Sequence, residues 1–207
     1  MFAPDSCAIV MFFRFGPGPH RVEIQLDFDP ADPIPGTEDR IIIELASIDE
    51  MPHTVCFFLS QVDKELFNGC SFHRNAGHVI QAGPAPNFKT PLDANPVERF
   101  KKSKLESVAF QEYSAKYPHV PYTLGFAGRP GGPDFYISVV DNSKIHGPGG
   151  QSRNDDLSEA DPCFATVIEG RDTVDRMVKA AVQPGTYKHM VHNINIRSMK
   201  IVNYKKQ

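Results

Sequence analysis

The stretch "SFHRNAGHVIQAG", Ser71 to Gly83, joins two short apolar segments through a turn and carries one arginine and one glutamine. Asn-Ala-Gly between apolar segments is a turn signal, so we expect two short strands here. Side chains alternate between the two faces of a strand, which places Val79 and Gln81 on the same side of the second strand. The segment therefore predicts a strand pair that displays polar side chains beside apolar ones.

The flanking sequence predicts more strands of similar length. Apolar and polar residues alternate strictly from Val22 to Phe28, as expected for a strand with one buried and one solvated face. Two segments instead show helical spacing, near 52–66 and 172–182, and Pro52 suits a first helical turn. The strands are expected at 20–28, 40–46, 70–74, 78–83, 122–128, 134–140, 162–170 and 194–202.

This order of elements predicts a mainly β fold, a closed antiparallel eight-stranded barrel capped by two α-helices. We expect a single domain over residues 1–207, with an extra N-terminal strand or hairpin at 7–19. The residues expected in its core are Val22, Ile24, Leu26, Phe58, Leu59, Phe164 and Val167.

Three irregular features accompany the strands. Residues 84–104 show no periodicity and are predicted to form a surface loop, and 145–161 is a second irregular stretch. In the last strand the alternation slips near Arg197, which indicates a β-bulge.

Composition excludes several classes of function. A formal net charge of −3 gives no basic surface for nucleic acid, and the apolar run at 7–13 is too short to span a membrane. Strand geometry does not bring Cys70, His73 and His78 onto one face, so we expect no metal site and no cofactor. Four cysteines neither require nor exclude an oxidising compartment, and the localisation stays unassigned. We expect a monomer.

Four segments resemble the cyclophilin family of peptidyl-prolyl isomerases. "IIIELASIDEMPHTVCFFLSQV" resembles the family's strand, its "P-T-x-x-N-F" motif and the helix that follows. "FHRNAGHVIQAG" resembles the "FHR…Q-G-G" signature, and "YTLGFAGRPGGPDFYIS" the segment that ends in two aromatic residues. "PCFATVIEGRDTVDRM" resembles "V-F-G-x-V-x-E-G-x-x-V". The resemblance runs from about His20 to Val202 and implies a cyclophilin-like barrel.

The resemblance also implies a reaction, the cis–trans isomerisation of X-Pro bonds in peptides and proteins. It makes Arg74 the catalytic residue, because a planar, always charged guanidinium can donate to the prolyl nitrogen in the twisted transition state. Gln81 would bind the substrate backbone and brace Arg74. The other substrate-binding positions that it implies are His78, Val79, Ala127, Gly128, Asp134, Tyr136, Leu157 and Asp161.

Several of these positions depart from the family pattern. His78 stands where an aromatic residue is usual, Asp134 replaces a glutamine, Tyr136 a phenylalanine and Asp161 a histidine. Leu157 keeps a wall position, but the family's tryptophan is absent because the chain contains none. Two added carboxylates would make the groove acidic and shift its preference towards basic peptides, unless both face water.

Two functions follow from this combination. The first is a proline isomerase with altered rate or specificity, and the alternative is a non-catalytic module that binds proline-containing peptides in the same groove. Asp134 separates them, because a direct ion pair with Arg74 would either hold the guanidinium in place or occupy the donors that the prolyl nitrogen needs.

Overall fold

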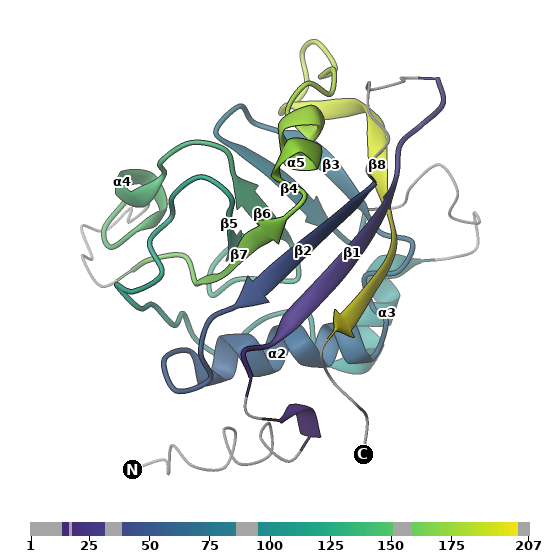
Figure 1. The fold of residues 1–207 in the computed structure, drawn as a ribbon. Coiled ribbons are helices and arrows are strands. Elements are labelled where there is room, and N and C mark those ends of the chain that lie inside the picture. The colour runs from purple at the N-terminus through teal and green to yellow at the C-terminus, as the bar shows by residue number, and fades with distance from the viewer. Residues whose placement is uncertain (1–13, 17, 32–38, 86–94, 151–158, 203–207) are drawn as a thin grey trace.

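The computed structural model describes residues 14–16, 18–31, 39–85, 95–150 and 159–202. Their eight strands form the predicted closed antiparallel barrel, in the order β1-β2-β7-β5-β6-β4-β3-β8. Figure 1 shows helix α2 across one open end of the barrel and α5 at the other, which confirms the predicted caps. The strands are β1 Arg21–Asp27, β2 Arg40–Leu45, β3 Ser71–Asn75, β4 Val79–Gly83, β5 Thr123–Phe126, β6 Phe135–Ser138, β7 Cys163–Glu169 and β8 His189–Val202.

The described residues contain four helices rather than two. They are α2 Pro52–Asp63, α3 Pro96–Ser103, α4 Ser143–His146 and α5 Arg171–Met177. None of them is long and apolar enough to span a bilayer. Residues 7–13 and 17 of the strand or hairpin expected at 7–19 lie outside the described residues.

Helix α3 corrects the prediction of a surface loop at 84–104. The Asn95 side chain accepts a hydrogen bond from the backbone N–H of Glu98, and Pro96 occupies the first turn, so the helix begins with a standard cap. Phe100 is fully buried and packs edge-on against Phe67, with ring centroids 5.2 Å apart. Eight residues with one buried aromatic side chain are too few to show helical periodicity in the sequence.

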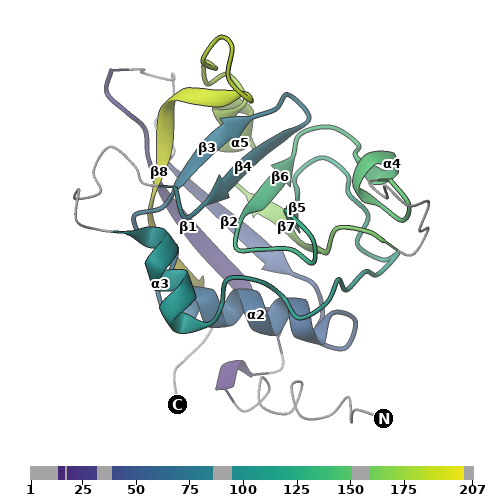
Figure 2. The ribbon, with the colours of Figure 1, turned by 180° about the vertical axis from the view of Figure 1, so that it is seen from behind.

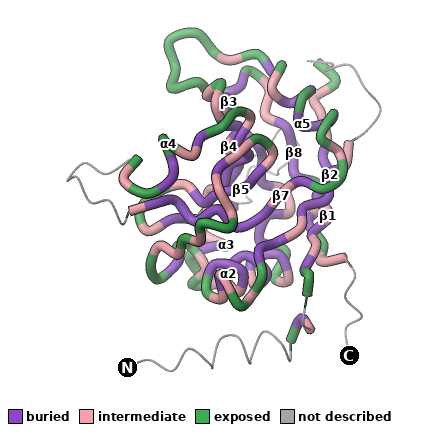
Figure 3. Tube along the Cα trace, turned by 60° about the vertical axis from the view of Figure 1, so that its left-hand side comes forward, coloured by how far each residue is buried: buried purple, intermediate pink, exposed green. Residues whose placement is uncertain are grey.

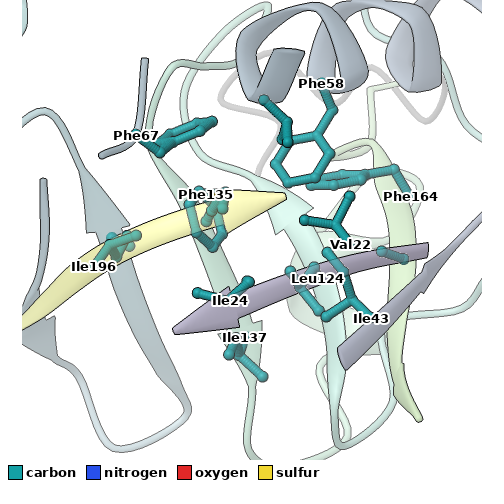
Figure 4. Close-up of a cluster of buried hydrophobic side chains, with 14 of the residues drawn as sticks. Val22, Ile24, Ile43, Phe58, Phe67, Leu124, Phe135, Ile137, Phe164 and Ile196 are labelled. Atoms are coloured by element: carbon teal, nitrogen blue, oxygen red, sulfur yellow. The ribbon is translucent and has the colours of Figure 1, made fainter. Parts of the chain in front are cut away.

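The barrel interior is filled by aliphatic and phenylalanine side chains (Figure 4). Figure 3 shows the same division along the chain, with buried strands inside exposed loops. Phe58 reaches from α2 into this core and lies within 4.8 Å of Phe164 and 5.8 Å of Phe67, measured between ring centroids. All seven residues predicted for the core have no exposed surface.

Several strand pairs of the barrel contain register shifts, and two of these bear on the sequence prediction and on the site. Between β1 and β8 the register shifts so that Arg197 is the extra residue, as the slipped alternation predicts. Between β3 and β4, Phe72 pairs with Ala82 but Arg74 pairs with Gln81, so His73 is the extra residue. Without this bulge, alternation would turn Arg74 to the same side as the buried Phe72. The bulge instead leaves Arg74 half-buried at the outer surface of the barrel.

Truncating the aromatic contact between α2 and the barrel should destabilise the fold strongly. We expect Phe58→Ala to lower the free energy of unfolding by about 3–5 kcal/mol, because it leaves a cavity among packed rings. Urea denaturation measures the change. Val97→Ala is the control, since Val97 is exposed on α3 and its truncation should cost less than about 0.5 kcal/mol. Equal effects of the two substitutions would contradict this account of the core.

Candidate active site

A pocket of about 570 Å³ opens on the outside of the barrel across the neighbouring strands β6, β4, β3 and β8. Figure 2 shows the face with β3, β4, β5 and β6. Eight of the ten residues predicted for the site line this pocket: Arg74, His78, Val79, Gln81, Ala127, Gly128, Tyr136 and Asp161. Asp134 is not among the lining residues, and Leu157 lies outside the described residues.

Arg74 is fixed by two neighbours on its own face of the barrel. Its Nη1 donates to Oε1 of Gln81 at 3.0 Å, and its Nε donates to the backbone carbonyl of Tyr187 at 3.2 Å. The Tyr187 ring also lies against the guanidinium, with 4.7 Å between Cζ and the ring centroid. A guanidinium has five N–H groups. Among the described residues the other three find no protein acceptor, so they remain available to a ligand.

Asp134 acts on Arg74 only through Gln81. The Gln81 Nε2 donates to Oδ2 of Asp134 at 2.7 Å, while its Oε1 accepts from Arg74. The structure forms no ion pair between Arg74 and Asp134 among the residues that it describes, so it gives no support to the direct pair considered from the sequence. Instead the carboxylate fixes which end of the Gln81 amide faces the arginine.

The position of Asp134 depends on a glycine. A side chain at Gly83 would place its Cβ 1.9 Å from Oδ1 of Asp134, so the carboxylate packs directly on the β4 backbone. The imidazole Nε2 of His73 lies 3.6 Å from Oδ2 of the same carboxylate. Burial raises the pKa of Asp134, and the Gln81 hydrogen bond and His73 offset part of that rise. Asp134, Gln81 and Arg74 thus form a hydrogen-bonded relay, and His73 and Gly83 fix the position of Asp134 at its far end.

The floor of the pocket is a buried polar cluster around Asp161. Its Oδ2 accepts from the Tyr136 hydroxyl at 2.8 Å and from Nδ1 of His146 at 2.7 Å, and its Oδ1 pairs with Arg129. The His119 Nε2 donates to the Asp161 backbone carbonyl at 3.0 Å. Burial acts to raise the pKa of Asp161, but the hydrogen bonds from His146 and Arg129 outweigh it, so the pKa lies below its ordinary value.

The sequence led us to expect that Asp134 and Asp161 make the groove acidic, but in the structure they do not. Asp161 is 1% exposed and fully paired, which also excludes the reading that it faces water. Asp134 lies behind Gln81, outside the pocket lining. Asp161 offers no open acceptor to a ligand, and Asp134, whose side chain is 29% exposed, does not line the pocket, so the lining gives no support to the expected preference for basic peptides.

Tyr136 fits this floor because the neighbouring strand has no side chain at Gly125. A Cβ there would lie 2.5 Å from the Tyr136 hydroxyl oxygen. The ring is 2% exposed, and burial together with Asp161 raises the pKa of the phenol well above its usual value. Tyr136 thus presents an uncharged ring to the pocket while its hydroxyl is bonded to Asp161.

Five lining residues could not be predicted from the sequence: His73, Ile145, His146, Tyr187 and His189. Ile145 and His146 belong to α4, and the backbone N–H of Asp161 donates to the carbonyl of His146 at 2.9 Å. His146 stacks on His78 with ring centroids 5.6 Å apart. The two stacked rings form a flat wall of the pocket. Burial and the neighbouring His146 lower the pKa of His78.

Asp161 should make the unfolding free energy depend on pH. A carboxyl whose pKa is lowered in the folded state stabilises the protein above its unfolded pKa, about 3.9, and this stability is lost as pH falls through the folded pKa. We expect Asp161→Asn to be less stable than wild type at pH 7 and to lose less further stability between pH 5 and 2. Denaturation at several pH values measures both slopes. The exposed Asp49→Asn is the control, and equal slopes for Asp161→Asn and wild type would contradict the cluster's role.

Comparisons with known proteins agree with this geometry. The family model described as "Cyclophilin type peptidyl-prolyl cis-trans isomerase/CLD" matches residues 34–201. No curated protein sequence matches the chain. A crystal structure of a cyclophilin type peptidyl-prolyl cis-trans isomerase from Cryptosporidium parvum is similar, with a TM-score of 0.63 and 15% identity, covering 90% of this chain and 99% of that one.

A second structure of the Cryptosporidium parvum protein was determined in the presence of the dipeptide Ala-Pro. It has a TM-score of 0.61 and 16% identity, and covers 87% of this chain and 98% of that one. At such identities the structural likeness shows the fold, whereas the family model covers most of the chain. The chain belongs to the family of cyclophilin-type peptidyl-prolyl cis–trans isomerases, and this membership supports the isomerisation of X-Pro bonds as its function.

Proposed function

We propose that this chain isomerises X-Pro bonds with Arg74 as the donor to the prolyl nitrogen. The observation that carries the proposal is the state of the guanidinium, which is held by Gln81 and Tyr187 yet keeps three N–H groups for a ligand. It lies on the rim of a pocket with an apolar side, as a bound proline requires.

The reaction needs little more than such a donor and a cup. Rotation about the X-Pro amide passes through a state in which resonance is lost, with a barrier of roughly 20 kcal/mol. In that state the nitrogen becomes pyramidal and basic, so a charged donor stabilises it more than either planar isomer. Only this difference accelerates the reaction.

The ring of the proline would lie on Val79, Tyr136 and Ile145. Val79 and Tyr136 are almost fully buried in the free protein, and Ile145 is 46% exposed on α4, where an occupant would cover it. Ile145 supplies an apolar wall in a chain that lacks the tryptophan usual in the family. A related structure was determined in the presence of Ala-Pro, which supports a proline-containing peptide as the occupant.

Ala127 and Gly128 would lie against the substrate backbone at the β5 end of the pocket, where the Ala127 carbonyl already accepts from the backbone N–H of Gly132. The backbone N–H of Ala127 donates to the carbonyl of Asp134, and Gly128 takes a φ of +98°, which a residue with a side chain rarely adopts. Gly128 therefore lets the chain turn where it borders the pocket, with no side chain to obstruct a peptide.

Removing the donor should abolish catalysis while leaving the pocket. We expect Arg74→Ala to lower kcat/KM by about 10²–10³, the size found when one preorganised donor is removed from a transition state. A protease-coupled assay on Ala-Pro peptides measures the rate, and Arg21→Ala, on β1 outside the pocket, is the control. Wild-type rates no higher than the spontaneous rate would support the binding-only alternative and contradict the proposal.

The hydrogen bonds from Asp134 through Gln81 to Arg74 predict that different substitutions of Asp134 lower kcat/KM to different extents. Asp134→Gln keeps an acceptor oxygen for Gln81 and should change kcat/KM by less than about threefold, because the effect on Arg74 is indirect. Asp134→Leu removes the acceptor and should lower kcat/KM by about tenfold, which corresponds to about 1.4 kcal/mol. The same assay measures both variants. A gain of tenfold in Asp134→Gln would show that the carboxylate sequesters Arg74 after all.

A further inference from the structure

The loop between α5 and β8, at the top of Figure 1, carries Tyr187, which lines the pocket. A bridge between Val182 and Met190 closes its base, and the backbone N–H of Gln183 donates to the carbonyl of His189 at 2.8 Å. The backbone N–H of Asn75 donates to the carbonyl of Lys188 at 3.0 Å, which ties the loop to the end of β3. The base of the loop is therefore anchored beside the end of β3, next to Arg74.

Tyr187, on this loop, is 76% exposed, more than any other large hydrophobic residue that the structure describes. Its carbonyl and one region of its ring are engaged by Arg74, as described above. The rest of the ring stays open to solvent at the edge of the pocket, of which Tyr187 is a lining residue. A ligand in the pocket can bury this exposed aromatic surface, which favours its binding.

Two further flat rings lie on the same side. The imidazoles of His73 and His189 are 6.3 Å apart between centroids and inclined by 30°, and both line the pocket. His73 comes from the bulge of β3 and His189 from the first residue of β8. The charged groups that face them are the Arg74 guanidinium and the Asp134 carboxylate, which lies 3.6 Å from His73.

The strand order places these rings at one end of the groove. From one end to the other the lining residues come from Ala127 and Gly128 just beyond β5, then from β6, β4, β3 and β8, with Tyr187 just before β8. Neighbouring strands lie about 4.8 Å apart, and an extended peptide advances about 3.3 Å per residue. The step from Arg74 on β3 to β8 thus spans about one or two residues of substrate.

We propose that Tyr187, His73 and His189 form a second subsite, which binds an aromatic side chain one or two residues from the proline on the side opposite Ala127 and Gly128. The inference rests on the proposed function of the same groove. Three flat rings suit an aromatic side chain because offset and edge-on ring contacts stabilise such pairs. An acidic side chain at this subsite would gain from Arg74, but it would be repelled by the Asp134 carboxylate, which lies 3.6 Å from His73.

Binding, measured apart from turnover, tests the subsite. Calorimetric titrations would use peptides Ala-Ala-Pro-Ala-Ala in which one alanine at a time is replaced by phenylalanine or glutamate. We expect wild type to bind the peptide with phenylalanine at one position about threefold to tenfold more tightly than the alanine and glutamate peptides. No phenylalanine preference, or a larger gain from glutamate, would overturn the proposal.

Variants locate the effect. Tyr187→Ala should reduce the phenylalanine preference to less than about twofold, and Tyr187→Phe should keep it. Val191→Ala is the matched control, because Val191 is exposed on β8 but does not line the pocket. A preference that survives in Tyr187→Ala, with native circular dichroism, would overturn the subsite.

The outcomes separate this subsite from the proposed function. Isomerisation without phenylalanine preference refutes the subsite alone. A phenylalanine preference in a protein that does not accelerate isomerisation refutes the catalytic proposal and leaves the subsite standing.

Discussion

The bulge at His73 is the constraint on which the site depends. Regular alternation along β3 would turn Arg74 to the side of Phe72, which packs in the barrel core, where a guanidinium would be buried at a large cost. One extra residue turns Arg74 to the outer face and brings it opposite Gln81 on β4. The same bulge leaves His73 beside Asp134. One local irregularity therefore brings Arg74 to Gln81 and His73 to Asp134.

Asp134 and Asp161, the two aspartates that depart from the family pattern, have different structural roles. Asp134 orients the Gln81 amide and through it the arginine, while Asp161 joins Tyr136, His146 and Arg129 beneath the proline cup. Each carboxylate is compensated by hydrogen bonds, as buried charges must be. Departures from the family pattern at these positions are therefore consistent with a preserved pocket, because both carboxylates are hydrogen-bonded to neighbouring side chains.

Much of the fold could be predicted from the sequence, because a barrel of short strands shows its alternation directly. The strand at Val22–Leu26 and the bulge at Arg197 both follow from the alternation of apolar and polar residues alone. Helix α3 could not be found this way, since its cap and its single buried phenylalanine involve too few residues. Strand β8 begins five residues earlier than predicted, although the buried Met190 between exposed neighbours extends the alternation.

The site was predictable only where its residues belong to continuous motifs. Arg74, Val79 and Gln81 lie within thirteen consecutive residues and reach the pocket together. Tyr187 lies 113 positions from Arg74 along the chain, and only barrel closure brings β8 next to β3. The role of Asp134 was misjudged because distance along the sequence could not show that Gln81 lies between the carboxylate and the arginine.

The central claim is that Arg74 is held in place before any substrate binds. Nitrogen-15 relaxation of the Arg74 Nε–H group in the free protein tests it directly, with the Gln81→Ala variant as reference. The account predicts an order parameter close to that of the rigid backbone in wild type, about 0.85, and a clear decrease in Gln81→Ala. An Arg74 side chain as mobile in wild type as in the variant would contradict the account.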